Sequence, residues 1–166
     1  MTGIALRALR LQDLGPRVRV RFSRHPEQGY PGLSPVEATT GPLELVAMVD
    51  TGSSLTVLQP GSFQRLGIVP SEETWIGSPA AQRQPHPSYV GTLTLAGTTG
   101  EVSMVARAVE IPGLGHVDAL LGRDVLTRGR FLYDGREGAC AMVLGGTEIP
   151  MMDPLEDRTE PGRGGG

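Results

Sequence analysis

Residues 45–58 read Leu45-Val46-Ala47-Met48-Val49-Asp50-Thr51-Gly52-Ser53-Ser54-Leu55-Thr56-Val57-Leu58, or LVAMVDTGSSLTVL. An apolar run ends at one carboxylate, Asp50, a small polar turn follows, and a second apolar run begins at Leu55. Short apolar runs bounded by turn residues are typical of buried β-strands. The stretch therefore predicts two strands joined by a turn, with an acidic side chain at the end of the first strand.

The composition favours short strands over long helices. The 166 residues include 24 glycines and 14 prolines, and only 4% of the chain is aromatic. This balance, with 39% hydrophobic residues, predicts one all-β domain with many turns and one or two short helices. Val18, Val20 and Phe22 alternate with arginines, which predicts a strand with one buried and one solvent-exposed face.

Charge, cysteine count and hydropathy exclude several classes of function. The net charge is −3, so no nucleic-acid partner is expected, and the N-terminal arginines are interpreted as a solvated strand face. Cys140 is the single cysteine, and His25, His86 and His116 lie far apart in sequence, so neither a disulfide nor a metal site is expected. No run of 18 apolar residues and no secretory signal is present, so we expect no membrane span and a cytoplasmic location.

The remaining patterns predict the order of elements along the chain. Residues 1–14 are expected to form an N-terminal arm, as a short helix or a loose segment, 15–144 the folded domain, and 145–166 a disordered polar tail. Other expectations are strands at 43–50, 55–58, 89–95, 101–109 and 119–122, a hairpin or loop at 70–87, a hairpin over 131–144, and short helices at 60–66 and 123–127.

A carboxylate at a strand end gains catalytic power when it meets a second one. Two carboxyls about 3 Å apart cannot both ionise cheaply, so they share a proton. One then activates water as a base, while the other protonates a carbonyl oxygen. Gly52 leaves room for water and a peptide, and Thr51 and Ser53 can hold the carboxylates in place.

Two segments resemble aspartic proteases of the retropepsin-like, single-lobe bacterial type. Val49-Asp50-Thr51-Gly52-Ser53 resembles the active-site signature, and the segment from Ala119 to Leu126 (ALLGRDVL) resembles the one that passes through the active-site loop into a short helix. Asp50 and Gly122 are 72 positions apart, and the resemblance covers residues 15–144. It implies a retropepsin-like acid protease barrel.

The resemblance also implies a homodimer, because the chain carries one signature and is too short for two lobes. A twofold axis would bring Asp50 together with its own copy. Asp50 would be the catalytic acid or base, Thr51 would bond across the axis, and Gly52 would present its backbone to substrate. Leu121 and Gly122 would support the catalytic loop, together with Ser53. Peptides or proteins would be the substrates, and no cofactor is needed.

A substrate-covering hairpin is implied between Thr74 and Tyr89, where Trp75, Ile76 and Gly77 are candidate substrate contacts. This segment is longer and less glycine-rich than the corresponding hairpin of retropepsins.

Two further departures concern the helix after Gly122 and the chain ends. In viral members the residue matching Arg123 pairs with an acid that follows the glycine of the signature by two positions. Ser54 stands there, so the same ion pair is not expected, and Asp124 is interpreted as complementing the helix dipole. The polar tail is poorly suited to an interleaved dimer sheet, so other strands are expected to form the seam.

Two functions therefore follow from the sequence. The first is an aspartic endopeptidase that hydrolyses peptide bonds with water activated by paired Asp50 carboxylates. The alternative is a non-catalytic peptide-binding or dimerisation module of the same fold. A third interpretation is purely structural, with Asp50 bonding its own backbone in a β-turn.

Overall fold

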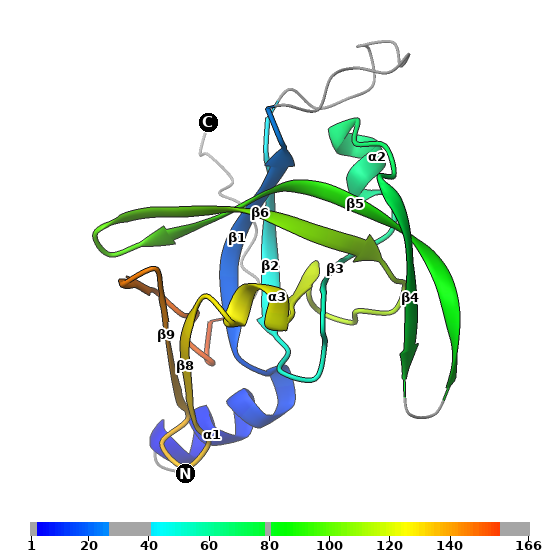
Figure 1. Cartoon of the computed structure of the whole chain (residues 1–166). Coiled ribbons are helices and arrows are strands. Elements are labelled where there is room, and N and C mark those ends of the chain that lie inside the picture. Colours follow the sequence, from blue (N-terminus) through cyan, green and yellow to red (C-terminus); the bar gives the residue numbers. More distant parts are fainter. Residues whose placement is uncertain (1–2, 27–40, 79–80, 157–166) are drawn as a thin grey trace, which may run out of the picture.

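Strands dominate the computed structural model, which describes residues 3–26, 41–78 and 81–156 (Figure 1). The expected N-terminal arm is a helix, α1 (Gly3–Leu14), and the two other helices are α2 (Ser62–Leu66) and α3 (Arg123–Leu126). The strands are β1 (Arg17–Arg24), β2 (Leu43–Val49), β3 (Thr56–Leu58), β4 (Glu72–Ser78), β5 (Ala81–Gly97), β6 (Gly100–Glu110), β7 (Ala119–Leu121), β8 (Gly129–Asp134), β9 (Ala139–Leu144) and β10 (Thr147–Ile149).

Six strands close into a barrel. The sheet order is β1-β2-β7-β3-β6-β5-β4, and β1 also pairs with β5, which joins the two ends of the first six strands. β5 is long enough for two tasks: its second half pairs with β1 and β6, while its first half forms a hairpin with β4 that extends beyond the barrel (Figure 1). The prediction of an all-β barrel is confirmed.

The alternating pattern of β1 builds one wall of the core. Val18, Val20 and Phe22 are buried, as period-two alternation predicts. The arginine face differs from the expected solvated face at Arg17, which is only 4% exposed. Its guanidinium donates a 2.8 Å hydrogen bond to the backbone oxygen of Glu156, so the C-terminal segment covers this end of the strand.

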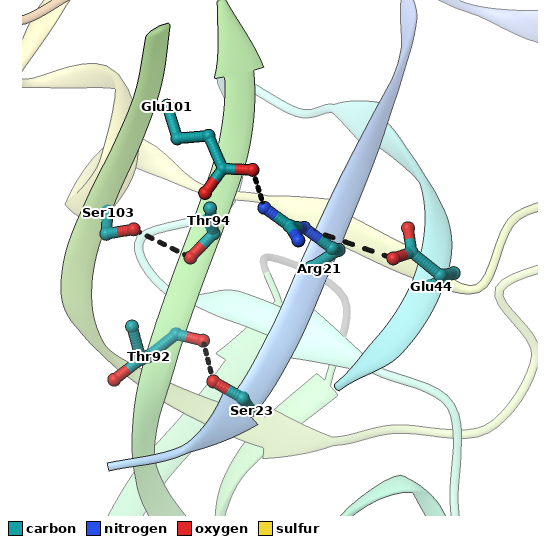
Figure 2. A network of polar contacts seen from close by, with 7 residues as sticks. All are labelled: Arg21, Ser23, Glu44, Thr92, Thr94, Glu101 and Ser103. Carbon is teal, nitrogen blue, oxygen red and sulfur yellow. Dashed lines mark hydrogen bonds and ion pairs between the residues drawn. The ribbon is translucent and has the colours of Figure 1, made fainter. Parts of the chain in front are cut away.

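The outer face of β1 and its neighbours is polar (Figure 2). Arg21 on β1 forms ion pairs with Glu44 on β2 and Glu101 on β6. Thr94 and Ser103 share a hydrogen bond of 2.8 Å between β5 and β6. Exposed pairs of this kind contribute little individually. The Arg21 guanidinium is thus paired with carboxylates of β2 and β6.

The segment expected to be a disordered tail is partly structured, so that prediction is wrong for residues 145–156. Gly145 and Gly146 have positive φ angles of 56° and 82° and form the turn from β9 into β10. Ile149 and Met152 are buried, and the Met152 N–H donates to the Arg17 carbonyl at 2.9 Å. The glycines thus mark a hairpin, and the apolar residues after them complete the core. Residues 157–166 lie outside the described residues.

The second sheet has the order β10-β9-β8. The predicted hairpin over 131–144 is confirmed, with Asp134 accepting hydrogen bonds from the N–H groups of Arg136 and Glu137 in its turn. Met142 and Leu144 of β9 are buried in the same core as the barrel. In the described part of the chain, no helix is long and apolar enough to cross a membrane.

Candidate active site

Asp50 lies immediately after β2, at the start of the loop to β3. The Asp50 N–H donates a 3.0 Å hydrogen bond to the carbonyl of Leu121, the last residue of β7. Its carboxylate is half-buried and accepts a 2.9 Å hydrogen bond from the Gly52 N–H. The Ser53 N–H donates to the Asp50 carbonyl at 3.3 Å. The acid is therefore held within its loop by backbone contacts on both sides.

β7 brings the second predicted motif beneath this loop. It lies between β2 and β3, parallel to β2, with Val49 opposite Leu121. Leu121 is fully buried, and the next residue, Gly122, lies against the loop backbone. A β-carbon at Gly122 would lie 2.4 Å from the Leu55 carbonyl oxygen, so only glycine allows this close approach. The sequence correctly predicted that the two motifs meet.

Arg123 contacts the backbone of the Asp50 loop. Its guanidinium donates to the Thr51 carbonyl at 3.1 Å, and its own N–H donates to the Ser53 carbonyl at 2.9 Å. An arginine here therefore needs no acid at Ser54, because carbonyl oxygens accept its hydrogen bonds. The sequence excluded the ion pair but did not reveal this substitute.

Asp124 bonds to Thr56 on β3, a contact that sequence reasoning missed. Its carboxylate accepts hydrogen bonds from the Thr56 N–H at 3.2 Å and the Thr56 hydroxyl at 3.1 Å. Burial raises the pKa of Asp124, while the bonds from Thr56 oppose that change. The two residues are separated by 68 positions, and neither carries a local signal of the contact. The interaction ties α3 to the strand that follows the loop.

A cleft of about 370 Å³ separates the Asp50 loop from the β4–β5 hairpin. Trp75, Ile76 and Gly77 from the hairpin line it together with Ser53. Trp75 is 64% exposed, which is unusual for a side chain of this size. The rest of the lining is Ser54, Leu55, Val57, Thr74, Arg83, Val109 and Ile111.

The predicted site residues occupy three positions around this cleft. Ser53 and the hairpin residues line it, whereas Asp50, Thr51 and Gly52 lie in the adjoining part of the same loop. Leu121 and Gly122 lie beneath the loop. Val109 and Ile111 were not predicted as lining residues; they follow from the parallel pairing of β6 with β3, which no local pattern encodes.

No group of three or more metal-ligating side chains occurs within residues 3–26, 41–78 and 81–156.

Comparison with solved structures gives similarities at low sequence identity. A retroviral protease-like domain of Ddi1 from Leishmania major is 12% identical, with a TM-score of 0.42, 69% of this chain and 89% of that chain being covered. A retropepsin-like aspartic protease from Rickettsia conorii is 15% identical, with a TM-score of 0.38 and coverage of 71% and 86%. The EIAV protease complexed with the inhibitor HBY-793 is 22% identical, with a TM-score of 0.34 and coverage of 51% and 75%.

Comparison with curated proteins gives no match. Comparison with protein families matches residues 36–125 to the family described as "Aspartyl protease". The match spans 90 of 166 residues and contains the Asp50 loop, the hairpin and the segment around Gly122. The family predicted from the two sequence motifs is thus confirmed, and the chain belongs to the aspartyl protease family.

Proposed function

We propose that the protein is an aspartic endopeptidase that acts as a homodimer, with one Asp50 from each subunit. The observation that carries this proposal is the placement of Asp50. A half-buried carboxylate stands at the end of a buried strand, in a loop fixed by β7 and α3, beside a cleft covered by a hairpin. A loop required only for a turn would not need the separate support of Leu121 and Arg123.

A second subunit supplies the second carboxylate in this proposal. The sequence contains one Asp-Thr-Gly signature, and the neighbouring acid Asp124 is engaged by Thr56. A twofold axis near the loop brings each Asp50 to its copy. Thr51 is exposed beside Asp50, where its side chain is available for a contact across that axis.

The paired carboxyls hydrolyse the peptide bond by general acid–base catalysis. The ionised carboxyl accepts a proton from water as the water oxygen bonds to the peptide carbon. The protonated carboxyl donates its proton to the carbonyl oxygen. In the second step the carbon–nitrogen bond breaks as the protonated carboxyl gives its proton to the nitrogen. The ionised carboxyl takes a proton from a hydroxyl of the tetrahedral carbon, so the pair again holds a single proton. The reaction is therefore fastest while the pair carries one proton, which favours pH values below neutral.

The cleft suits an extended peptide with apolar side chains. β4 and the first half of β5 lie on one side of the cleft, and strand-like backbone binds extended peptides by adding strand hydrogen bonds. Leu55, Ile76 and Ile111 line the cleft, are partly exposed and supply apolar surface. We infer that cleavage occurs between residues whose side chains are hydrophobic.

A peptide-library digest read by mass spectrometry tests the proposal, run over about pH 4 to 7 because one shared proton is required. The parent protein and the Asp50→Asn variant are compared, since asparagine keeps the shape but cannot exchange the proton. We expect cleavage by the parent and a loss of about 10²–10⁴-fold in the variant. Equal cleavage by both would contradict the mechanism. Binding of peptides by a dimeric parent without cleavage would identify a peptide-binding module of the same fold.

A further inference from the structure

The cleft beside the Asp50 loop is lined by one charged side chain, and it is a cation. Arg83 lines the cleft from β5, whereas the other described lining residues are serines, a threonine, a glycine and apolar or aromatic residues. No carboxylate is among them. Arg83 belongs to the β4–β5 hairpin, which extends beyond the barrel (Figure 1). A substrate in this cleft therefore meets a positive charge that no acid of the described lining balances.

The acids of the hairpin do not pair with Arg83. Glu72 forms an ion pair with Arg107 on β6. Glu73 lies opposite Pro87, four residues from Arg83, which is about 13 Å along the strand. In the described part of the chain, no carboxylate lies within ion-pair distance of the Arg83 guanidinium. The described residues thus leave this cation without a counter-ion.

Gly77 on β4 leaves space for the stem of Arg83. A β-carbon at Gly77 would lie 2.8 Å from Cγ of Arg83 and 3.1 Å from its Cα. The register of the hairpin is irregular at this point, between Ile76 and Ser78. Any side chain at position 77 would therefore force the Arg83 stem to shift. The absence of a side chain on β4 lets the arginine pack against the hairpin where both residues line the cleft.

A guanidinium in this position is suited to bind a carboxylate. Its planar group presents N–H donors in a fork that matches the two oxygens of a carboxylate. Arg83 is exposed in the free protein, so water solvates its charge. A peptide lying in the cleft displaces part of that water, which strengthens the attraction to an acidic side chain and the repulsion of a basic one. Complementary charge of this kind contributes mainly to specificity.

We propose that Arg83 is a specificity-determining residue that binds a glutamate or aspartate side chain of the substrate. The acid occupies one position of an extended peptide, near the hydrophobic residues that flank the cut. A lysine or arginine at the same position is disfavoured. The inference rests on the proposed function for the presence of a peptide in the cleft, and it adds the chemical class of one substrate residue.

Peptide binding to the full-length Asp50→Asn variant tests the inference separately from cleavage. Dye-labelled apolar peptides carry one glutamate, moved through every position, and each is matched by peptides with glutamine or lysine at that position. Fluorescence anisotropy at about pH 6 gives the Kd values, because a glutamate with a pKa of about 4.3 is ionised there. At one position we expect the glutamate peptide to bind about 5- to 10-fold more tightly than the glutamine peptide, and the lysine peptide to bind most weakly.

Two substitutions at position 83, made in the same Asp50→Asn background, assign the preference to the arginine. Arg83→Gln should give equal Kd values for the glutamate and glutamine peptides. Arg83→Glu should reverse the order, so that the lysine peptide binds most tightly, a result that loss of folding cannot produce. Arg10→Gln on α1 is the matched control for the loss of one positive charge, and it should keep the preference for glutamate.

The outcomes separate this inference from the proposed function. Equal Kd values for glutamate and glutamine at every position would overturn the role of Arg83, as would a preference that survives both substitutions or a failure to bind any of the peptides. Cleavage by the parent without a preference for acid would overturn the inference and leave the proposed function intact. An Arg83-dependent preference in binding, with no cleavage by the parent, would support the inference and contradict the endopeptidase.

Discussion

At the scale of single residues, the Asp50 loop requires a glycine at position 122 because the loop leaves no room for a side chain, and not because the backbone there needs an unusual conformation. Its φ angle is −85°, which any residue adopts, so the requirement is spatial. The carbonyl oxygen of Leu55 lies only 2.4 Å from the position that a β-carbon on residue 122 would take. A rigid backbone atom cannot move aside as the end of a side chain does.

Gly122→Ala should therefore destabilise the fold by about 1–3 kcal/mol, as overpacking does in well-packed sites. Chemical denaturation measures the free energy of unfolding. Gly41→Ala is the control, because a β-carbon there meets no atom of the described residues within 4 Å. Equal stability of the Gly122→Ala variant and the parent would show that the loop does not pass over Gly122 as described.

Asp124 gives the stability a defined pH dependence. Burial raises its pKa above the unfolded value of about 3.9, so the native state holds the proton more tightly than the unfolded chain. The unfolding free energy then falls as pH rises from the pKa of the unfolded chain to the higher pKa of the native state, since ionisation is less favourable in the native state. Its contribution is largest below the unfolded pKa and is lost above the folded one.

Asp124→Asn removes this titration while keeping an oxygen to accept a bond from Thr56. The unfolding free energy of the parent minus that of the variant should decrease as pH is raised from about 4 to 7. Denaturation curves at several pH values measure the difference. A difference that increases with pH would show that the hydrogen bonds from Thr56 dominate over burial.

At the scale of elements, the C-terminal segment is part of the core. Ile149 on β10 is 1% exposed, whereas Leu155, a few residues later, is 40% exposed. Ile149→Ala should cost about 2–5 kcal/mol, the usual range for a buried isoleucine, and Leu155→Ala should cost less than about 1 kcal/mol. Thermal and chemical unfolding of both variants would test this. Equal, small effects would mean that the segment is not packed as described.

The β4–β5 hairpin is the element expected to hold substrate. Trp75 lines the cleft but is largely exposed, so it contributes more to binding than to folding. Trp75→Ala should raise KM about 10-fold or more for apolar peptides, since aromatic anchors dominate binding energies. Its unfolding free energy should change by less than about 0.5 kcal/mol, as for other surface substitutions. Unaltered KM would show that substrate does not reach the hairpin.

At the scale of the whole molecule, local sequence patterns predicted the strands that meet at the site. The apolar run before Asp50 and the run before Gly122 were each recognisable, and their pairing followed from the family resemblance. Contacts between distant segments could not be predicted in this way. The sequence predicts an exposed Arg17, but the contact with Glu156 buries it. It also predicts disorder from Gly145 onward, whereas Gly145 and Gly146 form a turn that leads Ile149 into the core.

A mixing experiment tests most directly whether one active site is shared by two Asp50 residues. The parent and the Asp50→Asn variant are combined in equal amounts, allowed to exchange subunits, and assayed at fixed total concentration. Random pairing leaves about one quarter of the dimers with two aspartates, so activity should fall to about one quarter of the parent value. Mixing the parent with the Arg10→Gln variant, the control, should leave the activity at the parent value. A fall to about one half would mean that each chain works alone, and the shared site would be contradicted.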